Sequence, residues 1–186
     1  MKLPIRKYGD PVLRMKGQPI EQVDDKVRAL VEDMLETMEA ANGVGLAAQQ
    51  VGQPLLLTVL DISQVEDRPS ALKVNGATVD ELEAAMPLVL LNPTLALGNE
   101  TELGSEGCLS FPDITADIER AVTVEVEAET LEGKKVRLEA SGLLARALQH
   151  EVDHLNGILF VDRMSSVAKA SLGSRLKRLQ KETERL

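Results

Sequence analysis

Apolar residues recur at spacings of three and four in three stretches of the chain, and this periodicity predicts three helices. The first covers residues 24–41, with an aspartate as its N-cap, the second 141–155, and the third 165–186. The second helix carries two apolar stripes that leave little polar surface. We therefore expect it to be largely buried, whereas the third has only a narrow apolar edge of leucines.

Other stretches show the patterns of strands. Residues 55–60 form a continuous apolar run of strand length, and residues 88–92 form another that Asn92-Pro93 should stop. Residues 121–129 and 136–140 alternate between apolar and polar, which predicts a half-buried hairpin. The expected fold class is therefore α+β, with antiparallel strands packed around a central helix and with an N-terminal and a C-terminal helix.

Two stretches lack a clear period. Residues 63–87 are polar and contain prolines, so we expect a surface excursion with a short helix near 79–86. Residues 103–112 are rich in glycine, serine and proline and are interpreted as a loop.

Composition narrows the class of protein. The chain has 186 residues, 44% of them hydrophobic, so one globular domain is expected. Its formal net charge of −9 argues against DNA as a partner. A single cysteine excludes an internal disulfide, and no apolar run has the ~20 residues that span a bilayer. We expect a cytoplasmic protein that does not bind a membrane.

The strongest chemical signal is His150-Glu151-Val152-Asp153-His154. Residues four apart share one helix face, so both imidazoles can reach one metal ion while Glu151 lies beside it as a general acid and base. A catalytic site needs a third protein ligand. The chain has no third histidine, so the residues alone leave Cys108 or a carboxylate open.

Three segments together resemble the peptide deformylases. They are Gly43-Val44-Gly45-Leu46-Ala47-Ala48-Gln49-Gln50, Glu106-Gly107-Cys108-Leu109-Ser110 and Gln149-His150-Glu151-Val152-Asp153-His154-Leu155-Asn156-Gly157. Each of the family's three motifs is present, and in order. The resemblance implies an enzyme that hydrolyses the N-formyl group from the formyl-methionine of newly synthesised polypeptides and releases formate. It also implies a catalytic domain over 1–164, with 165–186 as a basic helix of the same domain.

The resemblance also implies roles for single residues. Cys108, His150 and His154 would bind one divalent metal ion, with Fe²⁺ as the usual metal and Zn²⁺ or Ni²⁺ able to replace it. Glu151 would be the general acid and base. The Gln50 side-chain amide and the Leu109 backbone N–H would form the oxyanion hole.

The same resemblance places the substrate. It implies an apolar pocket for the methionine side chain near the ligand helix, and we expect Val44, Leu143 and Ala147 to contribute to its wall. The backbone of Val44 and Gly45 is suited to pairing with an extended peptide, because glycine permits close approach. We expect the stem of Arg146 to cover this pocket with its charge turned outward. A buried Asp153 would need a cation, and Arg120 resembles the arginine that meets this aspartate in the family, so we expect the two to pair.

The last predicted helix has a different charge from the rest of the chain. Residues 165–186 carry six basic and two acidic side chains, a net charge of +4. Such a run is usually a solvated helix edge, but it could also dock on the ribosome, where nascent substrates emerge.

Three other functions remain open. A zincin-type metalloprotease would share the helix and its glutamate but would not need Cys108. A non-catalytic metal-binding module associated with the ribosome would need neither Glu151 nor Gln50. A thiol amidohydrolase that uses Cys108 as its nucleophile would stay active after chelation of metal.

Overall fold

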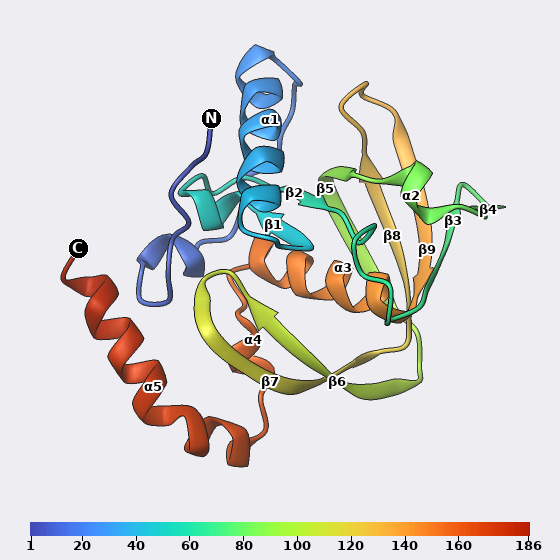
Figure 1. Ribbon diagram of the computed structural model, residues 1–186. Coiled ribbons are helices and arrows are strands. Elements are labelled where there is room, and N and C mark those ends of the chain that lie inside the picture. Colours follow the sequence, from blue (N-terminus) through green and yellow to red (C-terminus); the bar gives the residue numbers. More distant parts are fainter.

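Nine strands form two antiparallel sheets around one buried helix in the computed structural model, which describes residues 1–186 (Figure 1). This is the α+β fold that the sequence predicts. The large sheet has seven strands, in the spatial order β1 (Gly45–Ala47), β2 (Leu57–Leu60), β5 (Leu88–Leu97), β8 (Thr123–Glu129), β9 (Lys135–Ser141), β3 (Ser70–Val74) and β4 (Ala77–Thr78). The small sheet is one hairpin of β6 (Thr101–Cys108) and β7 (Phe111–Ala121).

The helices confirm the three predicted from apolar periodicity and the short one expected near 79–86, and one further short helix is present. The helices are α1 (Asp25–Ala40), α2 (Leu82–Ala85), α3 (Gly142–Leu155), α4 (Phe160–Arg163) and α5 (Ser166–Glu184), with 3-10 turns η1 (Pro11–Arg14) and η2 (Ala48–Val51). Asp24 caps α1 by accepting a hydrogen bond from the Val27 N–H, and Ser165 caps α5 in the same way from Ala168. None of these helices combines the length and the apolar character needed to cross a membrane.

Helix α3 lies between the large sheet and the β6–β7 hairpin (Figure 1) and contacts strands of both. Its apolar side chains join those of the large sheet in one buried cluster that includes Leu144, Leu148, Val126 and Leu138. Because both sides of α3 are covered, most of its side chains are buried, as its two apolar stripes predict.

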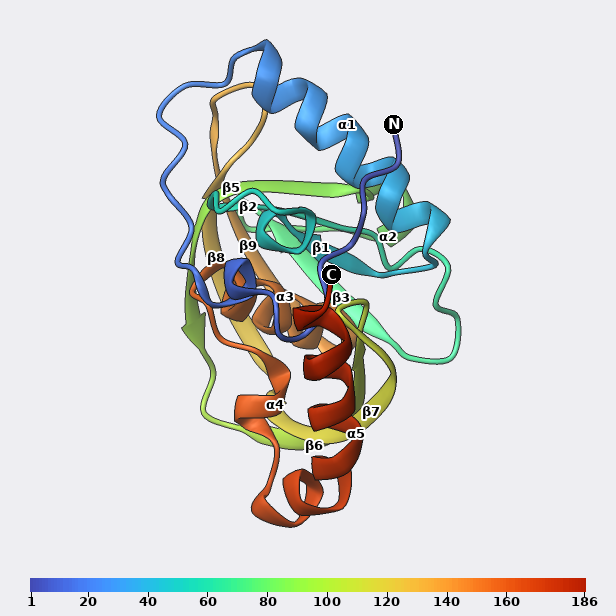
Figure 2. The ribbon, with the colours of Figure 1, turned by 90° about the vertical axis from the view of Figure 1, so that its left-hand side faces the viewer.

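Two smaller cores flank this centre. One is formed by α1 against β1 and β2, with Met34, Leu46 and Val59 fully buried. The other lies under the hairpin, where Phe111 and Phe160 pack edge to face at 4.9 Å between ring centroids and Leu176 of α5 is buried. Figure 2 shows α5 along the outside of the molecule, next to the N-terminal segment; Gly9 there approaches Gln180 of α5 closely.

Three sequence expectations are wrong. Residues 63–87 are not only a surface excursion, because β3 pairs with β9 and extends the large sheet. Strand β5 does not stop at Asn92, which adopts a positive φ of 51° in a bulge, and pairing with β8 resumes at Thr94. Residues 103–112 lie mainly in the β6–β7 hairpin, where the glycines are accommodated in a ladder and only the tip is a turn.

Candidate metal centre and active site

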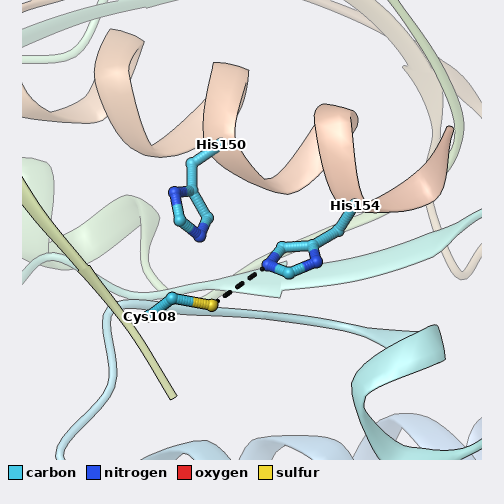
Figure 3. Close-up of side chains that lie close together, drawn as sticks. All are labelled: Cys108, His150 and His154. Atoms are coloured by element: carbon cyan, nitrogen blue, oxygen red, sulfur yellow. Dashed lines mark hydrogen bonds between the residues drawn. The ribbon is translucent and has the colours of Figure 1, made fainter. Parts of the chain in front are cut away.

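Cys108, His150 and His154 lie close together, with the two histidines on α3 and the cysteine at the end of β6 (Figure 3). One ligand atom from each lies within 4.8 Å of the other two, and Cys108 Sγ is 3.3 Å from His154 Nε2. The histidines project from successive turns of α3, because residues four apart share a helix face. The cysteine ends β6, where a register shift between Gly107 and Cys108 breaks the ladder.

The donor set fits a divalent transition metal. One thiolate and two imidazoles are ligands that iron, nickel and zinc all accept. Burial lowers the pKa of His154 well below its usual value, so its ring is neutral and free to bind a metal. Burial alone would lower the pKa of His150, but the neighbouring Cys108 and Glu106 side chains outweigh it and raise that pKa.

Glu106 orients His150. Its Oε1 lies 2.9 Å from His150 Nδ1, so Nδ1 carries the proton and Nε2 is left for a metal. Burial alone would raise the pKa of Glu106, but hydrogen bonds from Arg120 and His150 hold it well below its usual value. Glu106 is thus a fixed anion that sequence reasoning did not single out, although it belongs to the cysteine motif.

Glu106 belongs to a buried ionic cluster. Arg120 donates to Glu106 from Nε and Nη2 at 2.8 and 2.9 Å, and to Asp153 Oδ2 from Nη1 at 2.6 Å. The predicted Arg120–Asp153 pair is therefore present. Arg163 of α4 adds two further hydrogen bonds to the Asp153 carboxylate, at 2.9 and 3.1 Å. The cluster ties the hairpin and α4 to the ligand helix.

Arg146 completes this cluster and differs from its prediction. Its stem lines the cavity, but its guanidinium is turned inward, and only 5% of the residue is exposed. Nη1 donates to Glu106 Oε2 at 2.8 Å and to the Ile118 carbonyl at 2.7 Å. Gly104 leaves room for this guanidinium, because a Cβ at that position would lie 2.7 Å from it and would have to displace it. The expectation of an outward charge is wrong because hairpin carbonyls satisfy the charge inside.

Glu151 lies against strand β1. Its carboxylate is so close to Gly45 that a Cβ there would meet it at 2.8 Å. The residue is buried, and its Oε2 has no hydrogen-bond partner within the protein. Burial raises the pKa of Glu151 to about 7. A carboxyl group with that pKa can both accept and donate a proton at neutral pH.

Gln50 presents its amide nitrogen to the same space. The Ala47 N–H donates to Gln50 Oε1 at 2.9 Å, which fixes the orientation of the amide. Its Nε2 therefore points to Ser110 Oγ at 3.1 Å and lies 3.7 Å from Cys108 Sγ. Leu109 follows the cysteine in the hairpin turn, with its side chain against Gly43.

A cavity of about 530 Å³ opens over these groups. It brings together the residues that the sequence assigned to catalysis and substrate binding; those that line it are Val44, Gly45, Gln50, Cys108, Leu109, Leu143, Ala147, His150 and Glu151. His154 lies behind this wall and is buried.

Sequence reasoning missed part of the lining. Phe111 and Ile114 come from β7, and Arg68 comes from the segment before β3. Arg68 donates to the Ser105 carbonyl at 3.1 Å, so this segment reaches the cavity. Lys7 and Ile5 of the N-terminal segment also line it. No local pattern marks these residues, because they reach the cavity only through tertiary packing.

Comparisons with known proteins agree with this site. The family model described as polypeptide deformylase matches residues 2–170. A peptide deformylase of Methylacidiphilum infernorum is 44% identical over 181 residues, which cover 97% of this chain and 94% of that protein.

Two solved structures extend the similarity to the fold. A peptide deformylase from Thermus thermophilus superposes with a TM-score of 0.81 at 38% identity, covering 98% of this chain and 99% of the other. One from Synechococcus elongatus, in complex with actinonin, has a TM-score of 0.79 at 40% identity, covering 93% and 87% of the two chains. The chain belongs to the polypeptide deformylase family.

Proposed function

We propose that this protein hydrolyses the N-formyl group from the N-terminal formyl-methionine of newly synthesised polypeptides and releases formate. The observation that carries the proposal is the position of one buried carboxylate, Glu151, beside the cluster of Cys108 and the two histidines at the floor of an open cavity. Family membership supports the same reaction.

Cys108, His150 and His154 would hold one divalent metal ion, for which we propose Fe²⁺, with Zn²⁺ or Ni²⁺ able to take its place. When bound, the ion would supply Lewis acidity that polarises the formyl carbonyl and makes water more acidic. Glu106 would support it by holding the His150 ring in one tautomer.

Glu151 would move the protons. Its Oε2 has no partner in the protein and would accept a proton from the attacking water. The same carboxyl group would then donate that proton to the amine nitrogen of methionine as the C–N bond breaks. A pKa of about 7 suits both steps, because at neutral pH the group is then neither too weak a base nor too weak an acid.

Gln50 Nε2 and the Leu109 N–H would donate to the oxygen on which negative charge develops. The support for Gln50 is its fixed amide, whose nitrogen faces the cysteine. One such donor is typically worth about 2.7–4 kcal/mol of transition-state stabilisation.

The peptide would bind along β1. This strand pairs only with β2, so its other edge, at Val44 and Gly45, is open to an extended chain beside the cavity. Leu143 and Ala147 on α3 would contact the methionine side chain, since both line the same cavity.

The test is formate release from a short formyl-methionyl peptide by protein purified without oxygen, with its metal content measured in parallel. We expect stoichiometric formate, loss of activity on chelation, and loss of metal in Cys108→Ala. Cleavage of internal peptide bonds with Cys108→Ala still loaded would indicate a metalloprotease instead. Activity that survives chelation would indicate a thiol amidohydrolase. The absence of any hydrolysis would indicate a non-catalytic metal-binding module.

We also propose a cytoplasmic protein in which 1–164 form the catalytic domain and the helix of residues 165–186 docks on the ribosome. All six basic side chains of that helix are exposed, namely Lys169, Arg175, Lys177, Arg178, Lys181 and Arg185. Replacing the three lysines by glutamine should reduce co-sedimentation with ribosomes at low salt and spare activity on short peptides. This variant is preferred to truncation before Ser165, because truncation also removes Leu176 from the core under the hairpin.

A further inference from the structure

The N-terminal segment of residues 5–8, here called the N-terminal arm, passes directly beneath the proposed oxyanion donors. The Arg6 N–H donates to the Gln50 carbonyl at 2.7 Å, and the Tyr8 N–H donates to the Ser110 carbonyl at 2.9 Å. Between them, Lys7 Nζ donates to the Leu109 carbonyl at 3.1 Å. Three consecutive residues of the arm thus bind the two segments that carry Gln50 and Leu109.

These two segments are far apart in sequence and need something to fix their relative position. Gln50 belongs to η2 and Leu109 to the turn of the β6–β7 hairpin, and the small sheet shares no ladder with the large one. The side chain of Gln50 reaches Ser110 Oγ, and the Tyr8 ring stacks on Phe111 at 4.8 Å between centroids. The arm therefore bridges the gap through both its backbone and its side chains.

Lys7 is the only residue of the arm whose side chain donates a hydrogen bond to the hairpin turn. It is half-buried and lines the cavity. A charge-assisted hydrogen bond to a carbonyl is stronger than a neutral one and fixes the peptide that accepts it. A hydrogen bond to the Leu109 carbonyl restricts the backbone of the hairpin turn. It therefore also restricts the direction of the Leu109 N–H, which lies in the same turn.

We propose that Lys7 is a positioning residue that acts through Leu109 to align the oxyanion donors, so that the N-terminal arm is part of the active site. The inference rests on the proposed deformylase function. Complete removal of one oxyanion donor costs about 10²–10³-fold in kcat. Loosening its support should cost less, and we expect a kcat about tenfold lower for Lys7→Met.

The experiment compares Lys7→Met and Lys7→Arg with the unaltered protein, all metal-loaded, on a short formyl-methionyl peptide. Lys2→Met is the matched control, because Lys2 lies on the same N-terminal segment but is exposed. We expect Lys7→Met to lower kcat with KM and metal content unchanged, Lys7→Arg to restore most of it, and Lys2→Met to change nothing. The ¹H–¹⁵N signals of Leu109 and Ser110 should shift in Lys7→Met only.

Each other outcome overturns the inference. A raised KM with unchanged kcat would mean that Lys7 contacts the peptide itself. An unchanged kcat, or equal losses in Lys7→Met and Lys2→Met, would mean that the arm positions nothing. If the unaltered metal-loaded protein released no formate, the proposed function would fail as well, whereas the amide signals would still report whether Lys7 fixes the turn.

Discussion

Helices α3 and α5 both carry several charged side chains, but those of α3 are mostly buried and those of α5 are mostly exposed. Of the 14 residues of α3, 12 are buried, whereas of the 19 residues of α5 only Leu176 is buried. Every charged side chain of α3 faces a partner or the cavity, while those of α5 mostly face solvent. Among the basic side chains of α5, Arg175 contacts the Asp113 carbonyl.

The difference shows that position in the fold, and not residue type, gives these charges their effect. In α3, burial makes an unpaired charge costly, and the fold supplies Glu106 as a partner for Arg146 and Arg120 and Arg163 as partners for Asp153. In α5, water screens each charge, so single charges contribute little to stability. Substitutions of matched chemistry in the two helices should therefore differ strongly in effect.

The largest difference is expected for the two glutamates Glu151 and Glu182. Glu151→Gln keeps the size of the side chain but removes proton transfer, and we expect kcat to fall about 10²–10⁴-fold. Stability should not fall, because the neutral amide avoids burying a charge whose Oε2 has no partner. Kinetics on a formyl-methionyl peptide and urea unfolding measure both effects.

Glu182→Gln on α5 is the matched control. This glutamate is exposed and away from the cavity, so neither kcat nor stability should change. A Glu151→Gln protein with near-normal kcat would show that another group moves the proton.

The second prediction concerns the stability of the buried cluster. Asp153→Asn removes the carboxylate that accepts from Arg120 and Arg163, and breaking one side of such a buried pair typically costs about 3–5 kcal/mol. Arg120 keeps its bonds to Glu106, so we expect a loss near the lower limit. Urea unfolding at matched metal content measures this loss of unfolding free energy. A loss as small as that caused by replacing an exposed charge on α5 would contradict the role of burial.

The features of α3 that local sequence patterns determine could be predicted, namely the helix itself and the positions of its two histidines. The apolar periodicity of α3 and the four-residue spacing of its histidines fix both the helix and the direction of its ligands. Helix propensity and spacing are local properties, so α1, α3 and α5 could be predicted with their boundaries within a few residues.

The predictions that were wrong concern features that depend on contacts between segments distant in sequence. The β6–β7 hairpin carries glycines that indicate a loop, yet its cross-strand partners make it a sheet. Arg146 was expected to turn its charge outward because a long basic side chain usually keeps its charged end in water, whereas its acceptors lie on the hairpin, 28 to 44 positions away in sequence. Arg68 and Lys7 reach the cavity for the same tertiary reason.

A third prediction compares two glycines. A Cβ on Gly45 would lie 2.8 Å from the Glu151 carboxylate, so Gly45→Ala must displace that group. A misplacement of about 1 Å can cost about 10²-fold in rate, and we expect a loss of that order in kcat.

Gly173 of α5 supplies the control. A Cβ on Gly173 would meet no neighbouring atom within 4 Å, so Gly173→Ala should leave kcat unchanged. It should also stabilise the protein by about 0.5–1 kcal/mol, because alanine favours a helix interior. Equal kinetic losses in the two variants would mean that the tight contact with Glu151 is unimportant.

The smallest effect is expected at Asp162 of α4, which is exposed like the charges of α5 but forms an ion pair with Arg14. Arg14 Nη2 donates to Asp162 Oδ1 at 3.1 Å, and the Leu159 N–H donates to Oδ2 at 2.9 Å. Partial burial alone would raise the pKa of Asp162, but these two hydrogen bonds outweigh it and lower that pKa. The folded state therefore favours the ionised carboxylate.

The sign of the pH dependence follows from that lowered pKa. The ionised Asp162 stabilises the fold above the pKa of the unfolded chain, and this contribution is lost as the pH falls through the lower pKa of the folded state. Because the pair with Arg14 is partly exposed, Asp162→Asn should cost only about 0.2–1 kcal/mol at neutral pH. The difference from the unaltered protein should shrink below about pH 4, where aspartate begins to be protonated in the unfolded chain. Urea unfolding of both proteins across this range measures it, and a difference that stays constant with pH would show that the side chain stabilises α4 by packing and not by its charge.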